Sequence, residues 1–418
     1  MEILLRQARI IDPSSPFHLQ TKDILISNGS IKEIGSIQSP SAHIIEIEDL
    51  SVSPGWTDVF AHFCDPGFEF RETLETGATG AAKGGFTDVM VIPNTAPVIH
   101  NKSGVEYIVQ RSKTLPVHIH PIGAVTKNNE GKELAEMYDM HASGAVAFGD
   151  GLATIQSAGL LLKALQYLKA IDKPLIQVPD DLSISATGLM NEGILSTRLG
   201  LPGKPDIAEE LMVRRDIELA KYTGSKIHIT GISTAQSVAM VRQAKKEGLN
   251  VTASVTPYHL YFSDENLKEY DTNLKVNPPL RTIHDRDALR AGVMDGTIDC
   301  LATHHLPHDS DHKVVEFEYA NYGMTGLETA FAALLSSIPG IDPARLILFL
   351  SLNPRKIFGL PAATIHINQP ASLSLFNMTL NWTVGASVSK SDNTPFTGME
   401  LTGKPLGIIN KDQLFLND

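Results

Sequence analysis

Residues 52–63 read VSPGWTDVFAHF, a short run of β-branched and aromatic residues bounded by turn-forming residues. A run of this kind is typical of a buried strand. Seven similar runs follow along the chain, at residues 88–94, 117–125, 145–150, 174–178, 226–232, 250–257 and 299–305. We therefore predict eight buried strands in the middle of the chain.

Segments of helix length separate these runs. Residues 159–170, 206–223 and 234–248 place apolar side chains at i, i+3, i+4 and i+7, which gathers them on one face of a helix. Strands that alternate with amphipathic helices are typical of parallel α/β sheets. Eight such units between Val52 and about Ser337 predict a (β/α)8 barrel of the TIM-barrel class, and we assign residues 52–359 to it.

The two ends of the chain have a different pattern. Residues 1–51 and 360–418 alternate apolar and polar side chains in short runs, with turn residues such as Asn28 and Gly29 between them. This alternation is typical of antiparallel strands with one buried face. We predict a small β-sandwich domain formed by both termini, with its C-terminal strands at residues 364–368, 371–376 and 405–415.

Composition restricts the partners and the compartment. The chain of 418 residues has 35 basic and 47 acidic residues, a formal charge of −12, which argues against nucleic acid or an anionic membrane as the main partner. Its two cysteines, Cys64 and Cys300, form no CxxC motif and are expected to be reduced thiols. The N-terminus lacks the layout of a secretory signal, and no apolar run reaches the ~18 residues of a membrane span. We expect a cytoplasmic protein.

Active sites of TIM barrels form at the C-terminal ends of the strands. The residues at those ends are therefore the candidates for chemistry. They are Phe60, His62, Asn94, Asp150, Gly151, Val178, Gly231 and His304.

Longer motifs around these positions point to a family. The stretch PGWTDVFAHFCDPGFE at residues 54–69 is one of several, and the others span residues 76–98, 190–205, 233–260, 273–281, 295–308 and 389–401. With them the chain resembles the long bacterial dihydroorotases of the amidohydrolase superfamily, nearly from end to end. The resemblance implies the reversible closure of carbamoyl-aspartate to dihydroorotate, carried out at a centre of one or two zinc ions.

The resemblance also assigns the zinc ligands. It implies two histidines on strand 1, an acidic residue or carboxylated lysine on strand 4, one histidine on each of strands 5 and 6, and an aspartate on strand 8. The matching positions here are Phe60 and His62, Gly151 or its neighbour Asp150, Val178, Gly231 and His304. Only His62 keeps the expected residue.

These replacements predict that the metal centre is lost. A catalytic zinc ion needs about three protein ligands, and Phe60, Val178 and Gly231 carry no side-chain lone pair. We expect Phe60 and Val178 to fill the site with apolar packing, and we expect no metal cofactor. His62, Asp150 and His304 remain as residual candidates for weak binding of a divalent ion.

Part of the substrate pocket matches the family. Asn94, Asn277 and His308 stand at positions that contact substrate in similar dihydroorotases, as does the backbone near Tyr322 and Gly323, whereas the expected arginine is Cys64. These matches are explained equally well by side chains that satisfy loop backbone groups. The histidine-rich loop at residues 303–312 also has two interpretations, a metal-binding tract or an ordinary polar loop over the barrel mouth, and we favour the second.

Three hypotheses follow. The first is a dihydroorotase-like protein without activity that acts as a structural or regulatory partner, for example of aspartate carbamoyltransferase, and forms a homodimer. The second is an active amidohydrolase with an altered or relocated zinc centre near His62 and His304. The third is a small-molecule binder that uses Asn94, Asn277 and His308. We rank them in this order.

Overall fold

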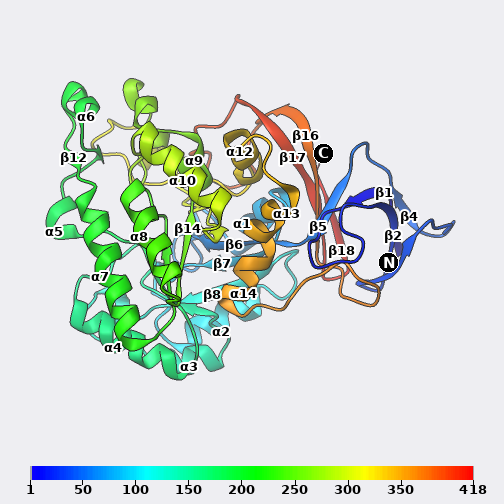
Figure 1. Cartoon of the computed structure of the whole chain (residues 1–418), viewed down its shortest axis with the longest axis horizontal. Helices are drawn as coiled ribbons and strands as arrows, with labels where there is room; N and C mark the ends of the chain where they lie inside the picture. Colours follow the sequence, from blue (N-terminus) through cyan, green and yellow to red (C-terminus); the bar gives the residue numbers. More distant parts are fainter. Residues whose placement is uncertain (1, 418) are drawn as a thin grey trace.

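A computed structural model describes residues 2–417, and its larger part is a parallel barrel of eight strands (Figure 1). Neighbouring strands pair in chain order around the barrel. They are β6 (Trp56–Ala61), β7 (Phe86–Val91), β8 (His118–Gly123), β9 (Ala147–Phe148), β10 (Leu175–Gln177), β13 (Ile227–Thr230), β14 (Val251–Val255) and β15 (Cys300–Leu301). The predicted (β/α)8 barrel is confirmed.

The barrel closes between its first and last strands. Ala61 forms a parallel bridge with His305, and the backbone N–H of His62 donates to the His305 carbonyl at 2.8 Å. Thr303 donates from both its backbone N–H and its hydroxyl to the buried Asp58 carboxylate, at 2.7 Å each. This closure sets the ends of strands 1 and 8 side by side at the mouth.

Amphipathic helices cover the outside of the barrel. In α4 the buried residues are Leu161, Ala164, Leu165 and Leu168, and the side chain of Ser157 caps the helix by accepting from the N–H of Leu160. The helices around the barrel are α1 (Leu74–Lys83), α2 (Lys102–Arg111), α3 (Met137–Ala142), α4 (Ala158–Ala170), α7 (Ile207–Thr223), α8 (Ala235–Lys246), α10 (Ile283–Asp295) and α12 (Ala330–Ser337).

Shorter elements lie in the connections. They are α5 (Leu182–Ser185), β11 (Met190–Asn191), α6 (Ile194–Leu199), β12 (Gly203–Lys204), α9 (Pro257–Tyr261), α11 (Ser310–Lys313), α13 (Pro343–Ile347) and α14 (Asn353–Phe358), with helical turns at Lys127–Asn129, Asp264–Glu269, Thr272–Leu274 and Leu348–Leu352.

Strands from both ends of the chain form a second sheet (Figure 1). Its strands are β1 (Glu2–Ile10), β2 (Thr21–Ser27), β3 (Ser30–Gly35), β4 (His43–Ile45), β5 (Ser51–Pro54), β16 (Leu373–Thr383), β17 (Glu400–Asn410) and β18 (Gln413–Leu416). We call it the terminal sheet. It has its own apolar core, which includes Ile3, Ile24, Val52 and Leu375. The prediction of a second β domain built from both termini is confirmed.

Two predicted strands differ from the structure. Residues 52–63 contain two strands, because β5 pairs with β1 and β16 in the terminal sheet and the barrel strand begins only at Trp56. The break falls at Gly55, whose carbonyl accepts from Ser351 and Arg355. Residues 364–368 form no strand, because the N–H of Ile365 donates to the Asp12 carboxylate at 2.7 Å.

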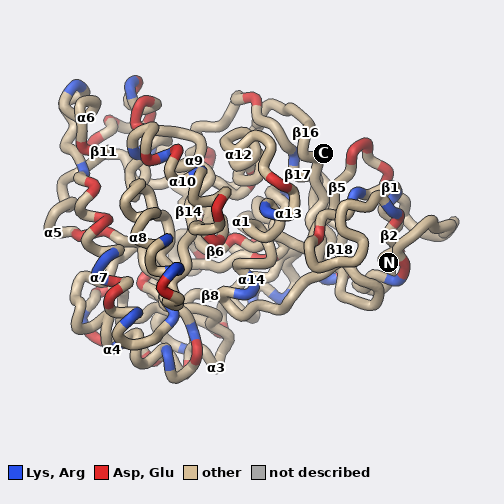
Figure 2. Tube along the Cα trace, viewed as in Figure 1, with Lys and Arg blue, Asp and Glu red and all other residues tan. Residues whose placement is uncertain are grey.

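Charges are mixed along the chain. Figure 2 shows Lys and Arg interspersed with Asp and Glu over both the barrel and the terminal sheet. Within residues 2–417, no helix combines the length and the apolar character that crossing a membrane requires.

Candidate functional site

The mouth of the barrel is filled by an aromatic pair. Phe60 is buried at the end of β6, and its ring stacks on the imidazole of His304 with centroids 4.3 Å apart and planes inclined by 30°. Phe60 and Val178 belong to one cluster of buried apolar residues inside the barrel. Two positions where the family resemblance implies metal-binding histidines therefore contribute to an apolar core.

Gly231 provides the space that the His304 ring occupies. Its φ is +70°, and a Cβ built on it would lie 2.7 Å from Cε1 of His304. Non-bonded carbon atoms prefer about 3.5–4.0 Å, so any larger residue at 231 would collide with the ring. Phe60, Gly231 and His304 thus form an interlocked set, in which the small residue admits the imidazole and the aromatic ring covers it.

Nε2 of His304 forms a hydrogen bond within the protein. Its Nε2 lies 2.8 Å from the hydroxyl of Thr230, which accepts at 2.8 Å from Ser254, and Ser254 lies 3.0 Å from Nε2 of His228. Burial lowers the pKa of His304 to about 3, so its imidazole is neutral near pH 7. His304 is part of a buried hydrogen-bond chain.

Asp150 bonds to the loop after β8. Its Oδ1 accepts from the backbone N–H groups of Val125 and Thr126, both at 2.9 Å, and its Oδ2 accepts from the hydroxyl of Thr126. Burial raises its pKa to about 6 despite these hydrogen bonds. The carboxylate holds the loop after β8 in place.

Asn94 supports the neighbouring loop. Its amide donates to the Asp150 carbonyl and accepts from the N–H of Leu152, both at 3.1 Å. Gly151 has a φ of +60°, and a Cβ there would lie 1.7 Å from Oδ1 of Asn94. Asn94 can hold this loop only because residue 151 has no side chain.

Asn277 forms hydrogen bonds to both members of a buried ion pair, Lys204 and Asp180. Nζ of Lys204 lies 2.6 Å from both the Asn277 side-chain oxygen and Oδ2 of Asp180, and the Asn277 amide donates to the same Asp180 oxygen at 3.2 Å. Lys204 comes from β12, and its ion pair with Asp180 links that strand to the loop after β10. Lys204 could not be predicted for this site from the sequence, because nothing in the local pattern relates it to Asp180 or Asn277.

Three side chains at the mouth keep nitrogen atoms that bond to nothing in residues 2–417. His62 is 7% exposed; its Nδ1 contacts the Cys64 sulfur at 3.5 Å, and its Nε2 is unpaired. His308 bonds through Nε2 to the Tyr322 carbonyl at 3.0 Å, which leaves Nδ1 unpaired, and Nε of Arg71 is unpaired as well. Arg71, which sequence reasoning missed, packs on the Phe68 ring at 5.4 Å.

The cysteines and the histidine-rich loop show structural contacts. Burial raises the pKa of the Cys64 thiol, so Cys64 is not an activated nucleophile, and Cys300 lies in the apolar cluster of the barrel. Asp309 caps α11 by accepting from the N–H of His312 at 3.2 Å. His305 accepts through Nδ1 from the N–H of Gly326 at 3.2 Å.

The residues present do not fit the zinc centre that the family resemblance implies. Three of the implied ligand positions hold no donor atom, Asp150 bonds to backbone groups, and His304 lies under a phenyl ring. Across residues 2–417, no three His, Cys, Asp or Glu side chains converge in an arrangement that could hold a metal ion. Of the implied ligands, only Nε2 of His62 is a free donor atom at this site.

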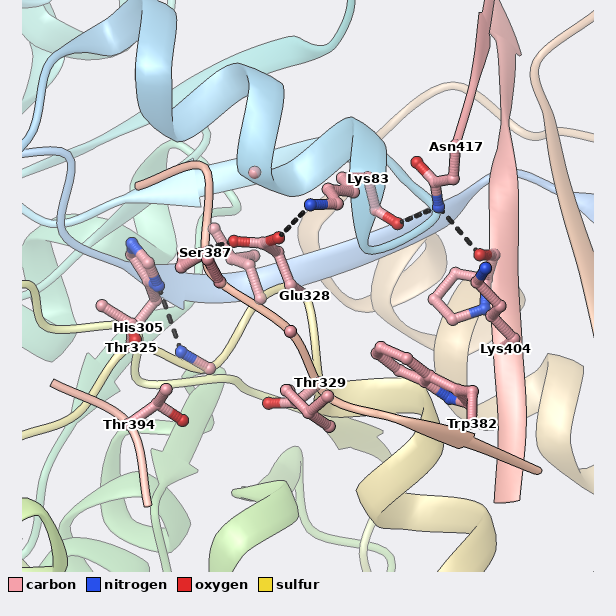
Figure 3. A pocket seen from close by; sticks show the side chains of 17 residues that line it. Lys83, His305, Thr325, Glu328, Thr329, Trp382, Ser387, Thr394, Lys404 and Asn417 are labelled. Atoms are coloured by element: carbon pink, nitrogen blue, oxygen red, sulfur yellow. Dashed lines mark hydrogen bonds and ion pairs between the residues drawn. The ribbon is translucent and has the colours of Figure 1, made fainter. Parts of the chain in front are cut away.

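A separate cavity of about 200 Å³ lies where the barrel meets the terminal sheet (Figure 3). Trp382 forms one wall, and Lys83 and Glu328 pair across it at 3.2 Å. His305 reaches it from the mouth, but Phe60, Val178 and Gly231 do not line it. The cavity is therefore distinct from the implied metal position.

Comparisons with known proteins agree with this architecture. A family model described as Dihydro-orotase-like matches residues 51–237. The dihydroorotase of Syntrophus aciditrophicus is 41% identical over 413 residues, covering 97% of this chain and 96% of the relative. That of Pelotomaculum thermopropionicum is 40% identical over 424 residues, covering 100% of this chain and 99% of the relative.

A solved structure supports the fold alone. The L-hydantoinase (dihydropyrimidinase) of Arthrobacter aurescens matches with a TM-score of 0.86 and 22% sequence identity, covering 99% of this chain and 96% of that chain. The sequence relatives are much more similar and span nearly their full length. On their evidence, this chain belongs to the dihydroorotase family.

Proposed function

We propose that this chain is a dihydroorotase-family protein that lacks zinc-dependent dihydroorotate hydrolysis and serves pyrimidine synthesis as a structural or regulatory partner. The observation that carries the proposal is the interlocked set of Phe60, Gly231 and His304 at the mouth. Hydrolysis of a cyclic amide by this family needs a metal-bound hydroxide, and the metal needs donor atoms where this chain packs carbon against carbon.

The same observation speaks against a relocated zinc centre. A centre built on His62 and His304 would need Nε2 of His304, which is bonded to Thr230, and would need space that the Phe60 ring occupies. Moving the imidazole would break a hydrogen-bond chain and open an apolar cavity, both of which cost free energy. The second hypothesis therefore has less support than the first.

The partner role is supported by the scaffold that is present in this chain. The barrel, the terminal sheet and the family motifs are all present, although the ligand set is not. Relatives over nearly the whole length bear the name dihydroorotase, so an enzyme of the same pathway is a natural partner. We propose aspartate carbamoyltransferase as that partner and a homodimer as the unit that binds it.

Two measurements test this proposal. We expect the purified chain to turn over neither dihydroorotate nor carbamoyl-aspartate above the rate without protein, also after incubation with zinc. We expect it to co-elute with aspartate carbamoyltransferase of the same organism in size-exclusion chromatography. Turnover at the rate of an ordinary dihydroorotase would refute the loss of activity, and separate elution at micromolar concentrations would refute the partner.

A specific observation supports a second function, the binding of a small carboxylate at the mouth. Nε of Arg71 is unpaired and can donate, and the unpaired Nε2 of His62 donates in the tautomer in which Nδ1 accepts from the Cys64 thiol. The unpaired Nδ1 of His308 can accept, because its Nε2 donates to Tyr322. A ligand with a carboxylate and an adjacent N–H group would satisfy all three.

This binding proposal keeps His308 but replaces the other two contacts that the sequence predicted. Asn94 and Asn277 are bonded within the protein, so Arg71 and His62 take their place beside His308. Calorimetry with dihydroorotate, orotate and carbamoyl-aspartate tests it, with Arg71→Gln as the variant. We expect binding that this variant weakens about tenfold or more, the effect of one hydrogen bond to a charged group. No heat at millimolar ligand would contradict it.

A further inference from the structure

The outer face of α7 carries a row of exposed side chains of mixed character. Because an α-helix turns once in about 3.6 residues, positions 207, 211, 214, 218 and 222 lie on one side of it. The residues there are Ile207, Leu211, Arg214, Glu218 and Tyr222, and all five are exposed. We call them the α7 stripe. The other side of the helix is buried in the protein, through residues such as Met212, Val213, Ile217 and Ala220.

Three members of the α7 stripe are apolar or aromatic. Ile207 is 45% exposed, Leu211 is 44% exposed and Tyr222 is 78% exposed. A single exposed apolar side chain is ordinary on a protein surface, but several on one face of one helix are typical of a surface that another protein covers.

The neighbouring helix α5 widens this apolar surface. Its residues Leu182 and Ile184 are exposed as well. The backbone N–H of Asp181 donates to the Ala208 carbonyl at 2.9 Å, which sets the start of α5 against the first turn of α7. Apolar side chains of two adjacent helices therefore face solvent on the same side of the barrel.

The two charged members of the stripe lie between the apolar ones. Arg214 and Glu218 are about one helical turn apart, and neither forms an ion pair with another residue within residues 2–417. Lys221, the next basic residue of the helix, pairs with Glu247 at 3.0 Å. The stripe thus offers one cation and one anion that have no ion-pair partner in the described chain.

The order of these side chains is complementary to its own reverse. From residue 211 to residue 222 it reads apolar, positive, negative, apolar. An antiparallel copy of the helix, related by a twofold axis at position 216, sets Arg214 opposite Glu218 of the other copy. The same axis brings Leu211 beside Tyr222 of the other copy. Because the arrangement is symmetric, each of these contacts forms twice.

The position of the stripe suits a pair of chains. Figure 1 shows α5 and α7 on the side of the barrel that lies away from the terminal sheet. Chains that meet through this side leave the terminal sheet of each copy open to a further partner.

We propose that the α7 stripe is the surface through which two copies of this chain pair, with their α7 helices antiparallel across a twofold axis. This inference rests on the homodimer of the proposed function and names its surface. Aromatic side chains and arginine are enriched in protein interfaces. The apolar contacts supply the stability of the pair, and the two Arg214–Glu218 contacts set its antiparallel orientation.

Charge reversal tests the pairing, with the mass of the full chain in analytical ultracentrifugation as the readout. We expect the parent chain to sediment as a dimer at micromolar concentrations. Arg214→Glu and Glu218→Arg each set like charges opposite one another twice, so we expect each to raise the dimer dissociation constant about tenfold or more. The double variant restores opposite charges, and we expect its dissociation constant to return to within about threefold of the parent value.

The matched control is Lys102→Glu, a charge reversal at an exposed position of α2, which should leave the dimer unchanged. Circular dichroism checks that every variant is folded, as expected for exposed helical positions. No recovery in the double variant would overturn the antiparallel pairing, and unchanged dissociation constants in both single variants would overturn the interface.

Two further outcomes separate this inference from the proposed function. A parent chain that is monomeric at tens of micromolar would overturn the interface and the homodimer together, whereas the loss of zinc-dependent activity is measured independently. If Arg214→Glu stayed dimeric but no longer co-eluted with aspartate carbamoyltransferase, the α7 stripe would bind that partner and the pairing proposed here would be wrong.

Discussion

The two ends of the barrel differ in what fills their centres. At the mouth, apolar packing fills the centre, because Phe60 covers His304 and Val178 joins the apolar cluster. The base is the end of the barrel opposite the mouth. There Asp88, His120 and Arg355 form a network in which both oxygens of the Asp88 carboxylate are bonded. The base is an interface between two domains, whereas the mouth is where the family carries out its chemistry.

This difference separates residues that the fold requires from residues that the family's reaction requires. The base network ties β7, β8 and α14 together and so supports the fold itself. The ligands at the mouth would be needed only for catalysis, and nothing in the barrel requires them. In this chain the base network is present, and three of the implied ligand positions at the mouth hold Phe60, Val178 and Gly231, whose side chains offer no donor atom.

The largest expected effect is at the base. Asp88→Ala leaves the buried guanidinium of Arg355 without its carboxylate, and removing one partner of a buried pair costs about 3–5 kcal/mol. We expect the free energy of unfolding in urea to fall by about 4 kcal/mol. The control is Asp295→Ala, which breaks an exposed pair with Arg242 and should cost less than about 1 kcal/mol. Equal losses in the two variants would remove the distinction between buried and exposed pairs.

The second effect tests whether the mouth is a packed core. Phe60→Ala empties a buried ring volume, and we expect a loss of about 3 kcal/mol of unfolding free energy. Phe60→Leu keeps most of the apolar contact and should cost less than about 1.5 kcal/mol. Urea titrations of both variants give the comparison. If Phe60→Ala changed stability by a few tenths of a kcal/mol, the mouth would be an open site and not a core.

The third effect tests the interlock. Gly231→Ala places a Cβ against His304 and should cost about 2 kcal/mol. Gly248 is the matched control, because its φ is +73° and nothing lies within 4 Å of a Cβ built there. Combining Gly231→Ala with His304→Ala should recover at least ~0.5 kcal/mol relative to the sum of the single variants. Strict additivity would show that the two positions do not share space.

The pH dependence of stability should differ between the two ends. Burial raises the pKa of Asp150 to about 6, so the folded state holds its proton more tightly than the unfolded state and loses stability as the pH rises from about 4 to 6. Burial also acts to raise the pKa of Asp88, but Arg355 and His120 outweigh it and hold that pKa well below its ordinary value. The contribution of Asp88 is therefore present at neutral pH and is lost only in strong acid.

The variant Asp150→Asn tests the contribution of Asp150 to the pH dependence of stability. Urea titrations from pH 4 to 7 should show that the variant lacks a downward slope of up to about 1.4 kcal/mol per pH unit that the parent chain has. Asp58 has a similarly raised pKa of about 6 and remains in both proteins, so some slope persists. Parallel pH profiles for the two proteins would contradict the raised pKa of Asp150.

The smallest expected effect on stability belongs to Arg71. Its Nε has no partner in the described chain, so Arg71→Gln should change the unfolding free energy by less than about 0.5 kcal/mol. The same variant should weaken carboxylate binding at the mouth. A loss of stability above 2 kcal/mol would instead identify Arg71 as a structural residue.

Local patterns were sufficient to predict most of the fold. The periodicity of residues 159–170, 206–223 and 234–248 predicted helices whose ends agree within two residues with α4, α7 and α8. The failures were at strand ends, where partners are distant in sequence. The break at Gly55 depends on Ser351 and Arg355, and the missing strand at residues 364–368 depends on Asp12.

The candidate site was predictable only in part. Residue identity alone predicts that Phe60, Val178 and Gly231 cannot donate to a metal. The close approach of Gly231 to His304 could not be predicted, because it depends on a backbone angle and on two strands meeting. Lys204 and Arg71 were missed for the same reason, since each reaches the mouth from a segment whose path is set by the whole fold.

The most direct test of the central claim is the zinc content of the purified chain. The protein is produced in zinc-supplemented medium, saturated with zinc, desalted and measured by mass spectrometry of the elements. Because phenyl, isopropyl and hydrogen stand where imidazoles would bind, we predict that no stoichiometric zinc remains. One or two zinc ions retained per chain, lost on substitution of His62, would contradict this account.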